Sequence, residues 1–151
     1  MLLTPHLLIG AAIGLKIPTL WLIIPISIFL HFLIDLIPHS HYSVDNIRQA
    51  DIINSLKEFM MVALDIAFGT IICGILIWRS EFFIYAVAGM AVSVLPDALT
   101  FIYWQTKTPV LKRLYDFHPE SLHPKKDPPF VKGLISQIIV SLAAIALILI
   151  I

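Results

Sequence analysis

Three aspartates lie inside long apolar runs that contain no lysine or arginine to pair with them: Asp35, Asp65 and Asp97. An ionised carboxylate at membrane depth is costly unless another group offsets its charge, so such residues usually mark an ion, proton or substrate site. The segment HFLIDLIPH places His31 one helical turn before Asp35 and His39 just after Pro38. Imidazole and carboxylate groups suit zinc, manganese or iron. The pattern therefore predicts a metal site, although an Asp–His pair that only joins two helices fits this motif equally well.

Two further histidines, His118 and His123, lie in a proline-rich stretch that cannot form one continuous helix. They could fold over the site as a lid or as ligands, and a solvated loop with incidental histidines is the alternative. The predicted metal ligands are His6, His31, Asp35, His39, Asp97, His118 and His123. The predicted catalytic residues are His118, His123 and Asp65, and His41 is the histidine least expected to take part. A metal ion would offset the aspartates' charge and lower the pKa of bound water to about 7.

The composition places the chain in a membrane. It is 59% hydrophobic and 13% charged, with a mean hydropathy of +0.93, which lies outside the range of soluble domains. The formal net charge is zero, so the chain lacks the basic excess that nucleic-acid binding requires. Cys73 lies in an apolar run and is expected to pack as a small hydrophobic residue. The first ten residues lack the signals of a removable leader, and we expect them to remain.

Five apolar segments predict an all-α fold, a transmembrane bundle of four to five helices in a single domain over 1–151. The predicted helices are about 2–15, 19–37, 57–78, 82–104 and 132–151, with polar loops at 38–55 and 105–130. The first would span only about 21 Å of the roughly 30 Å hydrocarbon core, so it need not cross fully. Within it, Gly10 and Gly14 would permit close contact with another helix. Pro25 and Pro96 predict kinks in their helices.

The charges predict an orientation for this bundle. If all five segments cross, the N-terminus and both long loops share one face, which carries eight lysines and arginines against two on the other face. The positive-inside rule places the first face in the cytoplasm. The histidines and the intramembrane aspartates then fall in one layer, with Asp65 and Asp97 roughly 10 to 12 Å below the cytoplasmic surface.

With these motifs, the chain resembles the family of membrane-bound metal-dependent hydrolases, also described as inner-membrane-associated hydrolases. The motifs that carry the resemblance are Thr4-Pro5-His6, the stretch from His31 to His39, Leu95-Pro96-Asp97, and the pair His118 and His123. The resemblance implies a multi-pass protein of a bacterial or archaeal cell membrane. It also implies metal ligands at His6, His31, Asp35, Asp97, His118 and His123. The chain departs from the family pattern after Asp97, where Ala98 replaces an acidic residue or histidine.

Three functions are compatible with these observations. The first is a metal-dependent hydrolase at the cytoplasmic membrane boundary, acting on a lipid-linked ester or phosphoester, because a headgroup ester lies near the depth of the aspartates. The second is a transporter or channel for protons or divalent cations, and the third is a non-catalytic structural membrane protein. Zinc is the expected metal, with manganese or iron as alternatives and with one or two ions possible. The bilayer is the expected partner, and the oligomeric state is open.

Overall fold

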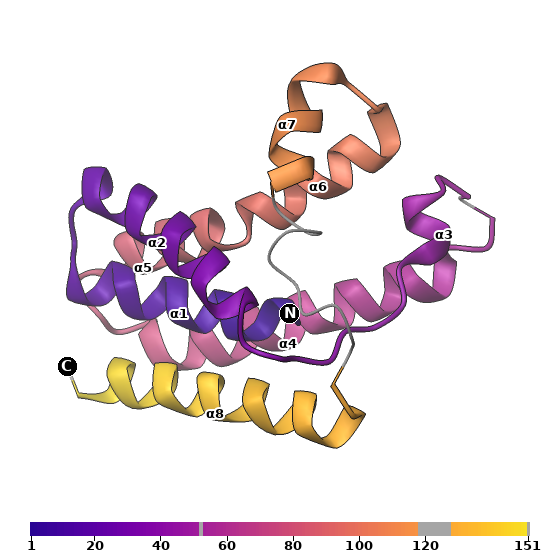
Figure 1. Ribbon diagram of the computed structural model, residues 1–151. Helices are drawn as coiled ribbons and strands as arrows, with labels where there is room; N and C mark the ends of the chain where they lie inside the picture. Colours follow the sequence, from indigo (N-terminus) through magenta and orange to yellow (C-terminus); the bar gives the residue numbers. More distant parts are fainter. Residues whose placement is uncertain (52, 118–127, 151) are drawn as a thin grey trace.

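The chain folds into α-helices connected by turns and loops (Figure 1). The computed structural model describes residues 1–51, 53–117 and 128–150, and these ranges contain no strand. The helices are α1 (Leu3–Lys16), α2 (Leu20–Asp35), α3 (Asp45–Arg48), α4 (Leu56–Ile77), α5 (Phe83–Ser93), α6 (Leu95–Thr106), α7 (Pro109–Phe117) and α8 (Phe130–Leu149). The predicted all-α fold is therefore confirmed. The short helices α3 and α7 lie in segments that were predicted to be loops.

Two helices, α4 and α8, are long and apolar enough to cross a membrane. The pair formed by α5 and α6 would be a third span if its two parts, bent by 41°, are counted together. Helices α1 and α2 are also apolar but have only 14 and 16 residues. Many large apolar side chains on α4 and α8 are exposed, including Phe68, Ile75 and Leu142. Continuous apolar surface of this kind is suited to contact with lipid rather than water.

The predicted helix over 82–104 is broken near its middle. Helix α5 ends at Ser93, and α6 begins at Leu95 with Pro96 in its first turn. Proline has no N–H to continue the hydrogen-bonding pattern of a preceding helix, and it is well tolerated in a first turn. The break puts Asp97 at the N-terminal end of α6, where the helix dipole favours a negative charge. Pro25, in contrast, lies inside α2, which runs on to Asp35.

Helix α1 lies at the centre of the molecule, against α5, α4, α8 and α2 (Figure 1). Eleven of its 14 residues are buried. A Cβ atom at Gly10 would collide with the carbonyl oxygen of Gly89, and one at Gly14 would collide with that of Tyr85. The predicted close contact through Gly10 and Gly14 is therefore confirmed, with Gly89 of α5 as its partner.

Helices α6 and α7 extend away from this helical body, and α3 lies at the same end (Figure 1). Helix α7 packs on α6, where the rings of Tyr103 and Tyr115 stack with centroids 4.6 Å apart. Arg48 of α3 donates a hydrogen bond of 2.7 Å to the Tyr115 hydroxyl. These contacts hold α3, α6 and α7 together on one side of the buried residues described next.

Candidate metal centre

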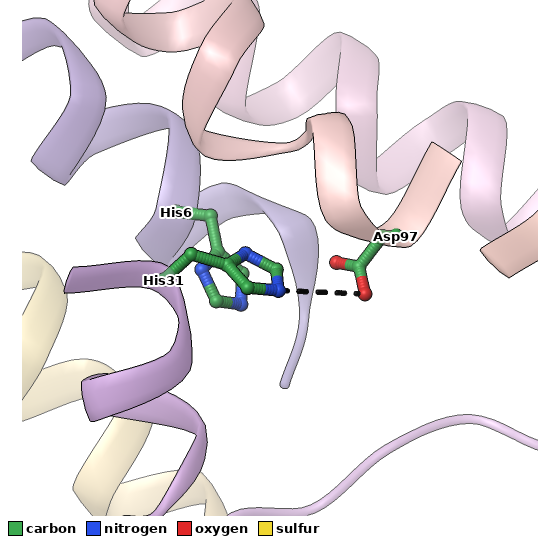
Figure 2. A group of neighbouring side chains, drawn as sticks. All are labelled: His6, His31 and Asp97. Carbon is green, nitrogen blue, oxygen red and sulfur yellow. Dashed lines mark ion pairs between the residues drawn. The ribbon is translucent and has the colours of Figure 1, made fainter. Parts of the chain in front are cut away.

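Two buried histidines from different helices stack on each other (Figure 2). His6 lies in the first turn of α1 and His31 in the last part of α2, and their ring centroids are 4.3 Å apart. Asp97 faces them from the start of α6. Each of the three residues offers one ligand atom, and these atoms all lie within 4.8 Å of one another. With ligand bonds of about 2 Å, a single metal ion could be held here after small side-chain rotations.

Asp35 completes this group of side chains. Its Oδ1 lies 3.3 Å from Nε2 of His6, and its Oδ2 lies 3.5 Å from Nε2 of His31. The same Oδ1 lies 3.1 Å from the amino nitrogen of Met1. Asp97 is slightly farther away, with its Oδ1 3.9 Å from Nε2 of His31 (Figure 2). We call His6, His31, Asp35 and Asp97 the His–Asp cluster.

The hydrogen bonds of His31 determine which of its nitrogens can bind a cation. Its Nδ1 lies 2.7 Å from the carbonyl oxygen of Ser93, which can only accept a hydrogen bond, so Nδ1 carries a proton. In the neutral ring Nε2 then has a lone pair, which faces the carboxylates of Asp35 and Asp97. A cation bound at this nitrogen would offset the negative charge of the two carboxylates. A histidine held by a backbone carbonyl in this way is typical of metal ligands.

The His6 ring lies beside a carboxylate, with its Nε2 3.3 Å from Oδ1 of Asp35. Neither of its ring nitrogens makes a hydrogen bond within the described ranges, and the side chain is fully buried. A buried polar atom without a partner costs about 1–3 kcal/mol. One divalent cation could bind one nitrogen of each ring.

Ser93 joins the two histidine-bearing helices to the break between α5 and α6. Its hydroxyl donates to the carbonyl oxygen of His6 over 2.7 Å, and its own carbonyl accepts from His31. Ser93 is buried, and the α5–α6 break follows it directly. Sequence reasoning missed this residue. Its position one turn before Asp97 in an apolar run was the available signal.

Asp65, which was predicted to be catalytic, lies at the N-terminus of α1. Its Oδ2 accepts a hydrogen bond of 2.6 Å from the backbone N–H of Leu3. Its Oδ1 accepts bonds from the backbone N–H and the hydroxyl of Thr4, at 3.2 and 2.6 Å. The residue at the N-cap of α1 itself, Leu2, has no side chain that can cap a helix. Asp65 of α4 therefore supplies the cap and holds the turn that carries His6.

Tyr42 also contacts this cap, although the sequence around it did not indicate a functional role. Burial raises the pKa of Tyr42 well above its ordinary value, and the charges of Asp65 and Asp97 raise it further. The hydroxyl therefore stays protonated and donates to Oδ2 of Asp65 over 3.4 Å. This contact ties the segment between α2 and α3 to the capped end of α1.

The remaining predicted site residues are placed as follows. His39 is buried, and its Nδ1 lies 2.7 Å from the carbonyl oxygen of Ile37. It does not belong to the group of three residues whose ligand atoms lie within 4.8 Å of one another. His41 is exposed. His118 and His123 lie outside the described residues. The structure thus brings together four of the predicted ligands, in the His–Asp cluster.

A cavity of about 680 Å³ lies beside the cluster. Asp97 lines it, together with His39, His41 and Tyr42. Most of the other lining residues are apolar and come from α4, α6 and the segment around α3. Asp97 therefore belongs both to the cluster and to the cavity wall.

No protein-family model matches the chain, and no curated protein or solved structure matches it either. The resemblance to membrane-bound metal-dependent hydrolases therefore stays a prediction from short motifs. The structure itself establishes an α-helical chain with two to three candidate membrane spans and a buried His–His–Asp group that could bind a metal ion.

Proposed function

We propose that this chain is an integral membrane hydrolase that uses a divalent metal ion and acts on a lipid-linked ester or phosphoester. The observation that carries the proposal is the convergence of His6, His31 and Asp97 from three helices, with ligand atoms within 4.8 Å of one another and a cavity of about 680 Å³ beside them. Three such ligands leave a coordination position open, as in catalytic zinc sites. Zinc is our first choice of metal, and iron or manganese also suits this ligand set.

In this proposal the residues of the cluster and their neighbours have different roles. His6, His31 and Asp97 hold the ion, which when bound would polarise the ester and lower the pKa of a water molecule to about 7. Asp35 lies within 3.5 Å of both imidazoles and is positioned to accept a proton from the attacking water. Ser93 keeps Nε2 of His31 directed at the cluster through its bond to Nδ1. Asp65 keeps the first turn of α1, and with it His6, in place.

The proposal includes an arrangement in the membrane. Helices α2, α4, α8 and the bent pair α5–α6 cross, and α1 is the enclosed fifth member of the bundle. Exposed apolar side chains on α2, such as Trp21 and Phe29, support its contact with lipid. The excess of lysine and arginine on the side of the long loops supports a cytoplasmic site in the cell membrane.

The interior beyond the cluster favours hydrolysis over transport. An ion path would need polar groups that continue from the aspartates toward the other side of the membrane. In α1, the buried residues beyond His6 are apolar or glycine, from Leu7 to Leu15. They pack into a hydrophobic core with Cys73 and Ile77 of α4 and with residues of α5 and α8.

Elemental analysis of the detergent-purified protein tests the metal site. We expect about one divalent ion per chain, as three ligands around a common point suggest. His31→Ala and Asp97→Ala should each lose the ion. The matched controls are His41→Ala, which changes an exposed histidine of the cavity wall outside the cluster, and Asp116→Ala, which changes an exposed aspartate on α7. Full metal content in both cluster variants would refute the site.

The reaction is tested separately in liposomes. Purified protein should release the headgroup from a lipid phosphoester or the acid from a lipid carboxylic ester, and a chelator should stop the release. The same liposomes, loaded with a cation-sensitive dye, report ion flux. Flux without hydrolysis would favour the transporter interpretation instead.

A further inference from the structure

The cavity beside the His–Asp cluster has two long helical walls. On α4 the lining residues are Phe59, Val62, Ala63 and Ile66, which recur at the spacing of one face of a helix. The seven residue steps from Phe59 to Ile66 correspond to about 10 Å along the helix axis. This wall is apolar along its whole length.

The α6 wall shows the same spacing but has one charged end. It begins with Asp97 and continues through Thr100, Phe101 and Trp104. The Asp97 carboxylate, which belongs to the cluster, therefore lies at one end of the slot. The rest of the slot is largely apolar. We call the space between these two walls the α4–α6 slot.

Two features indicate that the slot takes a ligand. The rings of Phe59 and Phe101 meet edge to face across it, with centroids 6.0 Å apart, so the walls are joined by side chains that can rotate. The Nε1 atom of Trp104 is buried and makes no hydrogen bond within the described ranges. A buried indole N–H usually has a partner, and a ligand oxygen would supply one.

We infer that the α4–α6 slot binds the hydrocarbon chain of a long-chain lipid ester, with the ester group at the Asp97 end. This inference rests on the proposed function, because it assigns the substrate class of the same site. The slot is continuous with the cluster through Asp97, and its walls belong to an integral membrane protein, so lipid chains surround it at high concentration. An apolar slot suits a hydrocarbon chain, and a longer chain removes more apolar surface from water than a short one does.

Ala63 gives the sharpest test because it is the smallest side chain of the α4 wall. Ala63→Phe places a ring in the slot, whereas Ala67→Phe makes the same change one turn along α4 at an exposed residue that does not line the cavity. Neither position belongs to the His–Asp cluster, so both variants should keep their metal.

Fluorescence of Trp104 reports occupancy without any hydrolysis. Trp21→Phe and Trp78→Phe remove the other two tryptophans and leave Trp104 as the single emitter. The probe is a lysophospholipid with a dibrominated stearoyl chain, added at low mole fraction to detergent micelles, since bromine quenches indole on contact. We expect saturable quenching, which unbrominated stearoyl lysophospholipid competes away and a hexanoyl analogue does not.

In Ala63→Phe the apparent affinity for the probe should fall by about tenfold or more, as expected when a hydrophobic pocket is filled. In Ala67→Phe it should match that of the parent. Quenching that rises linearly without saturation, or that is equal in Ala63→Phe and the parent, would overturn the inference. Saturable binding in a protein that hydrolyses no ester would instead support lipid binding in the slot and refute the proposed function.

Discussion

Asp65→Asn should destabilise the protein because it disrupts the cap of α1. The carboxylate accepts hydrogen bonds from Leu3 N–H, Thr4 N–H and the Thr4 hydroxyl. Asparagine can keep the two bonds to Thr4 through its oxygen, and the Tyr42 hydroxyl can rotate to accept from its NH₂ group. That NH₂ group would, however, face the Leu3 N–H, which is also a donor. One charge-assisted bond, worth about 1.5–3 kcal/mol, is lost. The favourable interaction with the α1 dipole, worth about 0.3–1 kcal/mol, is lost as well.

The expected loss in the free energy of unfolding is therefore about 2–4 kcal/mol. It can be measured by unfolding the purified protein with SDS in mixed micelles and monitoring helix content by circular dichroism. Asp116→Asn is the control, because Asp116 is exposed on α7 and pairs with Lys112 over 2.6 Å. An exposed pair of this kind contributes little, so the control should unfold like the parent.

The same variant distinguishes positioning from catalysis. If Asp65 positions His6, then Asp65→Asn should lower metal affinity along with stability, because the first turn of α1 carries the ligand. Unchanged stability in Asp65→Asn would refute the capping argument. Loss of hydrolysis with stability and metal content both intact would show that Asp65 acts on the substrate instead.

Three further predictions follow from the structure. Gly89→Ala should cost about 1–3 kcal/mol in SDS unfolding, because the new Cβ meets the backbone carbonyl of Gly10, while Gly74→Ala, with open space around it, should cost nothing. A chelator should remove the metal and so destabilise the protein. Compared with protein in which the free ion is at a hundred times its Kd, the free energy of unfolding should fall by about 3 kcal/mol. An unchanged unfolding curve would contradict a bound ion. Cys73→Ala should keep the full metal content, since Cys73 packs in the core beyond the cluster; loss of the ion in a folded variant would show a role for the thiol.

Local features of the fold could be predicted from the sequence because they depend on neighbouring residues. The apolar runs predicted the main helices, and the four-residue spacing of His31 and Asp35 predicted that they share a face. Pro96 predicted a disturbance in its helix, and the structure has a full break beside it. The two glycines of α1 predicted a close helix contact.

The role of Asp65 could not be predicted, because it depends on a distant part of the chain. Periodicity places the aspartate on α4, but it does not show that the N-terminus of α1 lies against it. A carboxylate in an apolar run can cap another helix or bind a metal ion. The N–H groups of a helix N-terminus and the positive charge of an ion both stabilise it, so the sequence does not distinguish the two roles. The stacking of His6 on His31 likewise depends on how α1 and α2 pack, which spacing alone does not specify.

The position of α1 has a consequence for how the protein is made. Helix α1 emerges from the ribosome before every helix that covers it, and its cap, its glycine contact and its apolar neighbours come from α4, α5 and α8. Until those helices have been synthesised, α1 has only α2 beside it. His6 and Asp97 can therefore come together only after α6 has been synthesised, which places assembly of the cluster late in biogenesis.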